Sequence, residues 1–209
     1  LRLLVTSATF RQDDRGSERA REIDADNRML SFYPRRRLSA EALRDQALFA
    51  AGLLKERFGG PSVKPYQPEG LWQEVAMLQS NTRVFEPSQG DDLFRRSLYT
   101  YYKRACPPPS MLTFDAPTRE SCVVRRPQTN TPMQALVLWN DEQFVEAARG
   151  LAVRALQEHA DDASRMAAMF VRCTSRTPTP AQGERLLREL QRARARFAAS
   201  PADAEALLA

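Results

Sequence analysis

The chain has few of the residues on which metal and redox chemistry depend. Its 209 residues include one histidine and three cysteines. Cys106, Cys122 and Cys173 lack the paired spacing of a zinc site, and no cysteine stands near His159 in the sequence. The Cys-x-x-Cys-His signature of a c-type haem is therefore missing, and we expect no metal and no cofactor in this chain.

Lysine is scarce, and so are long apolar runs. Three lysines stand against 28 arginines, and the net charge is +5. Acidic residues surround most of the arginines, and no basic face interleaved with aromatics is visible, which disfavours nucleic-acid binding. No apolar run approaches the span of about 20 residues that crosses a bilayer. We therefore expect no membrane span.

The residues that are present favour a mostly α fold, an irregular helical domain with long proline-rich loops. Apolar residues at helical spacing follow a Ser39 cap, and Gly59-Gly60 supplies a left-handed stop. Asp91 is expected to cap a further helix that carries Phe94, with an aromatic strand as the alternative. We expect a single domain over residues 1–209. Since the chain opens without an initiator Met, inside an apolar-periodic element, we interpret it as a fragment of a longer protein.

Two segments have the pattern of a capping box. Thr131 can cap the first turn of a helix, Pro132 loses no hydrogen bond there, and Gln134 can reach back. The segment Thr179-Pro180-Ala181-Gln182 repeats this pattern. Asn140 falls on the apolar stripe that follows, so we expect it to be buried and bound to loop backbone. Helices should begin at both boxes.

The segment from Cys106 to Asn140 is the best candidate for a binding role. Three prolines after Cys106 exclude a helix there, and a short loop then carries five charged side chains: Asp115, Arg119, Glu120, Arg125 and Arg126. Binding residues tend to lie on loops held by a scaffold, whereas an internal salt-bridge cluster is the alternative interpretation. In that case Asp115 should be ion-paired to one of the arginines.

The cysteines leave one question open. Cys106 and Cys122 lie 16 positions apart, and a disulfide between them would contribute about 3 kcal/mol through loop closure, but pairing does not follow from sequence. Cys173 follows Met166 and Phe170 at helical spacing, which predicts a free thiol in a core face.

Two aromatic residues lie in and just after a proline-rich loop. Tyr66 and Trp72 are expected to anchor the extended loop of residues 61–70. The alternative is a sugar-stacking pair, which together with the arginines would suit an anionic polysaccharide. Both remain binding candidates.

Several blocks together resemble a known bacterial family over nearly the whole chain. They are RRRLSAEALRDQAL (35–48), GGPSVKPYQPEGLW (59–72), RRSLYTYYKR (95–104), PPPSMLTFDAPTRESC (107–122) and RRPQTNTPMQALVLWND (125–141). In this order they resemble the PSD-type domain of unknown function, which lies C-terminal in large planctomycete and verrucomicrobial proteins with a cytochrome-c-like domain upstream.

The resemblance implies an exported, multi-domain protein whose upstream domains are the partners of this chain and in which an upstream domain can carry haem. It implies no catalytic residue. We therefore expect a non-catalytic accessory or interaction domain. The alternatives are an anionic polysaccharide-binding module and, third, a glycan hydrolase. A hydrolase needs two carboxyls, for which Asp115 and Glu120 are the nearest pair, but arginines beside them would lower the pKa that an acid catalyst needs raised.

Overall fold

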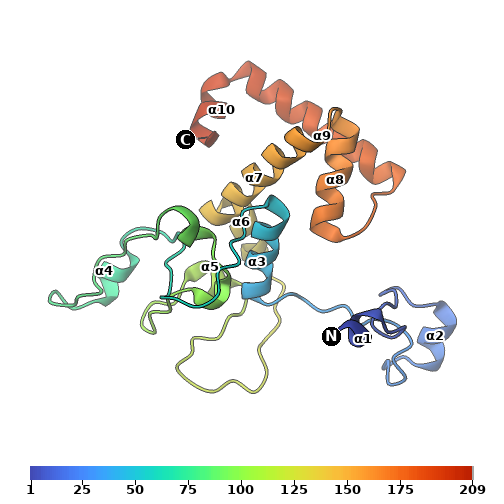
Figure 1. The fold of residues 1–209 in the computed structure, drawn as a ribbon, viewed down its shortest axis with the longest axis horizontal. Coiled ribbons are helices and arrows are strands. Elements are labelled where there is room, and N and C mark those ends of the chain that lie inside the picture. The colour runs from blue at the N-terminus through green and yellow to red at the C-terminus, as the bar shows by residue number, and fades with distance from the viewer. Residues whose placement is uncertain (209) are drawn as a thin grey trace. The chain divides into compact units, whose positions relative to one another are not determined.

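The computed structural model describes residues 1–208, and about 52% of the chain is helical. Ten α-helices and no strand occur among the described residues, which confirms the mostly α prediction. The chain divides into two compact units, Leu1–Leu38 and Ser39–Ala209 (Figure 1). That these units work as one domain stays a prediction. Within the described residues no helix has both the length and the apolar character to cross a bilayer.

The first unit holds two short helices, α1 (Arg2–Thr6) and α2 (Glu18–Ile23). α2 lies in a polar segment rich in charged residues. Asp24 follows it, buried, and its carboxylate accepts hydrogen bonds from the N–H groups of Arg28 and Met29 at 2.6 and 2.9 Å. A polar segment with little core is thus shaped by one carboxylate.

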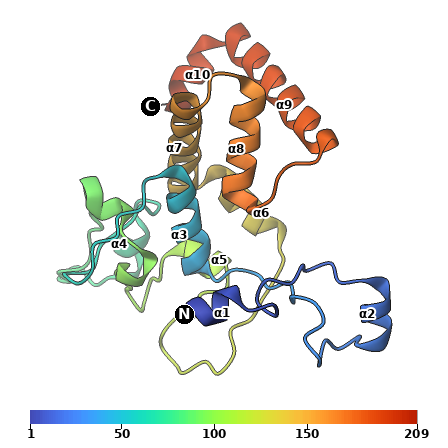
Figure 2. The same cartoon turned by 45° about the vertical axis from the view of Figure 1, so that its right-hand side comes forward.

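The second unit is built on the pairing of α3 (Ala40–Ala51) with α7 (Glu142–Glu158). Leu48 and Ala51 pack on Ala147 in its larger core cluster. Along the chain, α8 (Asp162–Thr174) lies against α7 and α9 (Pro180–Ala199) lies against α8, with α10 (Pro201–Leu208) last (Figure 2).

The helix starts follow from the sequence. Ser39 Oγ accepts the Ala42 N–H at 3.2 Å, as predicted. Thr179 and Gln182 form the expected capping box of α9. The predicted end of α3 is wrong, because the helix stops at Gly52 (φ 76°), well before Gly59. Gly52 takes the left-handed conformation that glycine adopts without steric cost, so the apolar stripe continues in sequence but no longer on a helix.

Residues 53–106 are irregular rather than helical or sheet-like. They contain α4 (Leu71–Val75) and two 3₁₀ turns, η1 (Gly90–Phe94) and η2 (Ser97–Tyr99). The α-helix predicted from Asp91 is wrong, and the aromatic strand is not formed either. Only isolated β-bridges, such as Val63 with Thr100, occur in this described segment.

Two buried arginines supply hydrogen bonds that a sheet would otherwise provide. Arg44, on the inner face of α3, is 4% exposed and donates to the carbonyl oxygens of Leu93 and Arg95 at 2.6 and 2.8 Å. Its Nε donates to Gln143 Oε1 at 2.6 Å. Burial lowers the pKa of Arg44 to about 10, although Asp45 and Asp141 act in the opposite direction. Each guanidinium offers five donors in a rigid fork, which suits several carbonyls at once.

Arg95 serves the next loop in the same way. It is 1% exposed, donates to Pro61 O at 2.8 Å and to the Gly59 carbonyl, and lies 3.9 Å from the ring centre of Tyr99. Because Arg95 also receives a bond from Arg44 at its carbonyl, the two guanidiniums connect α3 to residues 57–61. The irregular segment is thereby held to the helices.

Candidate functional site

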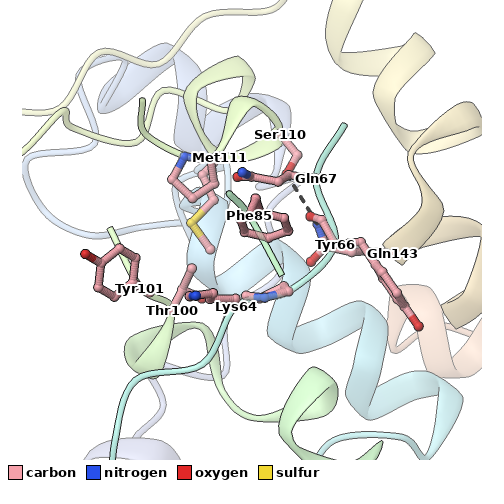
Figure 3. Close-up of a pocket in the computed structure, with 11 residues that line it drawn as sticks. Lys64, Tyr66, Gln67, Phe85, Thr100, Tyr101, Ser110, Met111 and Gln143 are labelled. Carbon is pink, nitrogen blue, oxygen red and sulfur yellow. Dashed lines mark hydrogen bonds between the residues drawn. The ribbon is translucent and has the colours of Figure 1, made fainter. Parts of the chain in front are cut away.

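One small pocket lies where α5 (Pro109–Thr113) meets the irregular segment (Figure 3). Gln143 Nε2 reaches it from α7 and donates to Tyr66 O at 3.2 Å and to Ser110 Oγ at 3.4 Å. Its accessible space is about 10 Å³, enough for roughly one water molecule and far below the roughly 300 Å³ of a small-ligand site. Thr100 Oγ1 and Gln67 Nε2 line it without a protein partner among the described residues, so one water is the fitting occupant.

The pocket is lined mainly by uncharged side chains. Its described lining consists of aromatic and apolar side chains, amides, hydroxyls and Lys64, with no carboxylate, imidazole or thiol. General acid–base catalysis needs a group that titrates near the working pH. In the described part of the chain, no group of three or more His, Cys, Asp or Glu residues is placed to hold a metal ion.

Trp72 and Tyr66 do not form a stacking platform. Trp72 is 2% exposed, and its ring packs edge-on against Phe85 at 5.0 Å between centroids and in a tilted arrangement against Tyr101 at 5.6 Å. Lys103 Nζ lies 4.7 Å from the Trp72 ring centre. Tyr66 is half-buried at the small pocket. Trp72 therefore anchors the loop and has no face for a sugar ring.

The predicted ion pair of Asp115 is wrong. Asp115 instead accepts hydrogen bonds from the backbone N–H and the hydroxyl of Thr129, at 2.7 and 2.9 Å. The chain after α5 leaves in a left-handed turn at Asp115 (φ 62°) and returns to it at Thr129. This contact closes residues 116–128 into a loop, which extends away from the helices of the second unit in both views of the fold (Figures 1 and 2).

The arginines of this loop fasten its two limbs to the body of the unit. The guanidinium carbon of Arg119 lies 4.3 Å from the ring centre of Tyr102. Arg126 Nη1 pairs with Glu41 Oε2 of α3 at 2.7 Å. Burial is the largest single influence and would raise the pKa of Glu41, but the hydrogen bond and charge of Arg126, together with hydrogen bonds from the Glu41 backbone and Ser39, outweigh it and the pKa is lowered. The five charged side chains thus do not converge on a cleft.

The tip of the loop is exposed. Glu120, Cys122, Val124 and Arg125 are all solvent-accessible, and the exposed fraction of Val124 is 105%. Cys122 is a free thiol, as is the half-buried Cys106, so the disulfide that the spacing left open is not formed. The tip presents two adjacent apolar side chains, Val123 and Val124, next to an arginine.

Gln134 connects this loop to α5 and α6 (Pro132–Asn140). The predicted capping box with Thr131 is confirmed, with the Thr131 N–H at a long 3.5 Å from Gln134 Oε1. Gln134 is 4% exposed, and its Nε2 donates to the Thr113 carbonyl at 3.0 Å and to Thr129 Oγ1 at 3.1 Å. These shorter bonds give the side chain a second role, since it joins the loop base to α5.

α6 turns its polar residue Gln134 inward and leaves most of its apolar residues exposed. None of its nine residues is charged, and Gln134 is the one buried residue among them. Four large apolar side chains are exposed: Met133 (57%), Leu136 (55%), Leu138 (41%) and Trp139 (83%). A helix that is apolar all round is normally buried. We call these four side chains the α6 face.

Two further predictions about buried residues are wrong. Asn140 is exposed and donates from Nδ2 to Leu136 O of its own helix at 2.8 Å. The stripe on which it was placed breaks there, because Asp141 caps α7 as a separate helix. Cys173 is exposed in the last turn of α8, beyond the half-buried Phe170.

Sequence reasoning missed Arg44 and Gln143. The signal for Arg44 was its place one turn from both Ala40 and Leu48, on the buried face of α3. An arginine on an apolar stripe must find acceptors. Gln143 gave no such signal, because its partners lie far away in the sequence.

Comparison with known proteins identifies a family but no characterised relative. No curated protein and no solved structure matches the chain. One family model, PSD1, described as a protein of unknown function (DUF1553), matches residues 1–190. The blocks that carry the resemblance hold Arg44, Arg95 and Gln134, three of the side chains that fix the irregular segment and the loop. The chain belongs to the PSD1 (DUF1553) family.

Proposed function

We propose that the chain is a non-catalytic accessory domain that docks, through the α6 face and the loop of residues 116–128, onto an upstream domain of an exported multi-domain protein. In this proposal the upstream part is cytochrome-c-like and carries any haem, and this chain holds no cofactor. Both the multi-domain context and export are suggested by the family resemblance.

The observation that carries the proposal is the exposed α6 face. Trp139, at 83% exposure, and Leu136, at 55%, place large apolar side chains in water. Each would gain roughly 1.5–3 kcal/mol if it were fully buried. Monomeric proteins seldom leave contiguous apolar patches without a partner, and tryptophan is enriched among residues that dominate binding energy.

The rigidity of the surface also supports docking. Gln134 and Asp115 hold the base of the loop, while Arg119 and Arg126 fasten its limbs. A surface fixed before binding loses less conformational entropy on association. Catalysis has no comparable support, since the small pocket holds about one water molecule and has no carboxylate, imidazole or thiol in its lining.

Hydrogen exchange compares the full-length protein with the isolated chain of residues 1–209. We expect amides of residues 132–140 to exchange at least about tenfold more slowly in the full-length protein, because a docked partner suppresses local opening. Residues 180–199 of α9 serve as an internal control, for which we expect no such change.

Equal exchange of residues 132–140 in both proteins would contradict the proposal. A third sample of the isolated chain with heparin, an anionic polysaccharide, separates the alternative. If heparin slows the amide exchange of residues 132–140 and the upstream domains do not, the result would favour the polysaccharide-binding module instead.

A further inference from the structure

We infer that the partner surface is an apolar pocket with carboxylates at its rim, which receives the Trp139 indole and binds Arg119 and Arg125 of the loop. This inference rests on the proposed function and adds the chemistry of the partner. It follows from the charge, orientation and exposure of the side chains of α6 and of the loop that precedes it in the chain.

The α6 face and the loop together carry a net positive charge. Residues 116–140 contain three arginines against one acidic residue, Glu120, and α6 itself has no charge. Arg126 is paired with Glu41. Among the described residues, no carboxylate pairs with Arg119 or Arg125. An approaching surface therefore meets apolar side chains bordered by positive charge, and complementary carboxylates would guide and orient it.

Arg119 is held in a geometry that suits a carboxylate. Its guanidinium lies over Tyr102, with 4.3 Å between the guanidinium carbon and the ring centre, and the residue is exposed. Stacking occupies the face of the guanidinium and leaves the N–H donors at its edge available. Two parallel N–H donors match the two oxygens of a carboxylate. Arg119 is therefore oriented for such a bond before the partner arrives.

Trp139 is the natural centre of the contact. It is the most exposed large side chain of α6, and interface cores are apolar while their rims are polar, with tryptophan and arginine both enriched. The loop closes at Thr129, and Gln134 bonds to Thr129 from inside α6, so the base of the loop is tied to the start of the helix. In the inference, Trp139 is the anchor of the contact and the loop arginines are its rim.

The test uses a photo-crosslinking benzophenone amino acid at position 139 of the full-length protein, with crosslinked peptides identified by mass spectrometry. We expect crosslinks to a segment outside residues 1–209 that carries Asp or Glu close to the crosslinked residue. The yield should fall about two- to fivefold in Arg125→Glu, as for the loss of an exposed charge pair, and also in Arg119→Lys, which keeps the charge but loses the planar fork.

Arg188→Glu is the matched control. Arg188 lies on α9 with its side chain 59% exposed. Arg188→Glu therefore changes the net charge by the same amount as Arg125→Glu but leaves the loop unchanged. Its crosslinking yield should equal that of the protein in which no arginine is substituted. Circular dichroism verifies that every variant is folded. Raising the salt concentration should lower the yield in the parent and have less effect in Arg125→Glu.

The outcomes separate the inference from the proposed function. Crosslinks to a segment without acidic residues, or yields that ignore Arg119, Arg125 and salt, would overturn the inference and leave docking standing. An absence of crosslinks beyond residues 1–209 would overturn both. Crosslinks to lipid in the presence of anionic vesicles of phosphatidylglycerol, in place of protein crosslinks, would overturn both in favour of a membrane surface.

Discussion

Replacement of Arg44 by methionine should severely destabilise the second unit. Methionine has similar length and is apolar, so the change removes the donors with little change in volume. It leaves the carbonyl oxygens of Leu93 and Arg95 and the Oε1 of Gln143 without their partner. Each buried acceptor left unsatisfied costs about 1–3 kcal/mol.

Two effects oppose each other in this substitution. Three lost acceptor contacts sum to roughly 3–9 kcal/mol, while the variant is spared the desolvation of a buried guanidinium, worth several kcal/mol. The acceptors include backbone carbonyls, which no side-chain substitution can remove, so the loss should prevail. We expect a net decrease of about 3 kcal/mol in the free energy of unfolding, a large part of the roughly 5–15 kcal/mol of a typical domain.

Urea denaturation followed by far-UV circular dichroism measures this change. Arg96→Met is the matched control, because Arg96 is 45% exposed and lies 3.5 Å from Asp45 in a surface pair, which is worth about 1 kcal/mol or less. If Arg44→Met costs no more than Arg96→Met, the buried guanidinium does not hold the irregular segment and the reasoning is refuted.

Three smaller perturbations test the caps, the loop and the helix packing. Thr131→Ala should cost about 1 kcal/mol and speed hydrogen exchange at the start of α6; unchanged exchange would count against the capping box. The lowered pKa of Glu41 means that its pairing with Arg126 stabilises the loop above the unfolded pKa of 4.5 and that this contribution disappears as pH falls through the lower folded value. Hydrogen exchange of residues 116–128 measures this contribution. The part of their protection that falls with pH in the parent protein should be absent in Arg126→Gln, which has no ion pair to lose. Gly150→Ala should destabilise α3–α7 packing by about 1 kcal/mol net, because the new Cβ would lie 3.1 Å from Leu53 Cδ1 and 3.2 Å from Ala51 Cβ. Gly183→Ala on α9 meets nothing within 4 Å and should instead stabilise by about 0.5–1 kcal/mol; equal effects of the two substitutions would contradict the packing argument.

Local signals predicted the helix starts well. Ser39, Thr131 and Thr179 begin helices as expected, because a cap is decided by the few residues around it. Ends were harder. Gly52 and Gly59 both take left-handed backbone conformations, and the sequence alone does not say which of them the packing of α3 on α7 will use as the stop.

The irregular segment and the loop could not be predicted because their contacts join distant residues. Arg44 meets Arg95 51 positions away, and Asp115 meets Thr129 instead of a nearby arginine. Composition suggested ion pairs in the loop, but backbone and hydroxyl donors reached Asp115. The exposure of the apolar side chains of α6 could not be predicted either. The sequence indicated that Gln134 belongs to the capping box, but not that it is also the buried residue of the helix.

Hydroxyl-radical footprinting of the two tryptophans tests the central claim, that the α6 face is covered by another part of the full-length protein. In the isolated chain, Trp139 at 83% exposure should be oxidised readily and Trp72 at 2% hardly at all. In the full-length protein, we expect oxidation of Trp139 to fall severalfold, toward the level of Trp72. Equal oxidation of Trp139 in both proteins would contradict the claim.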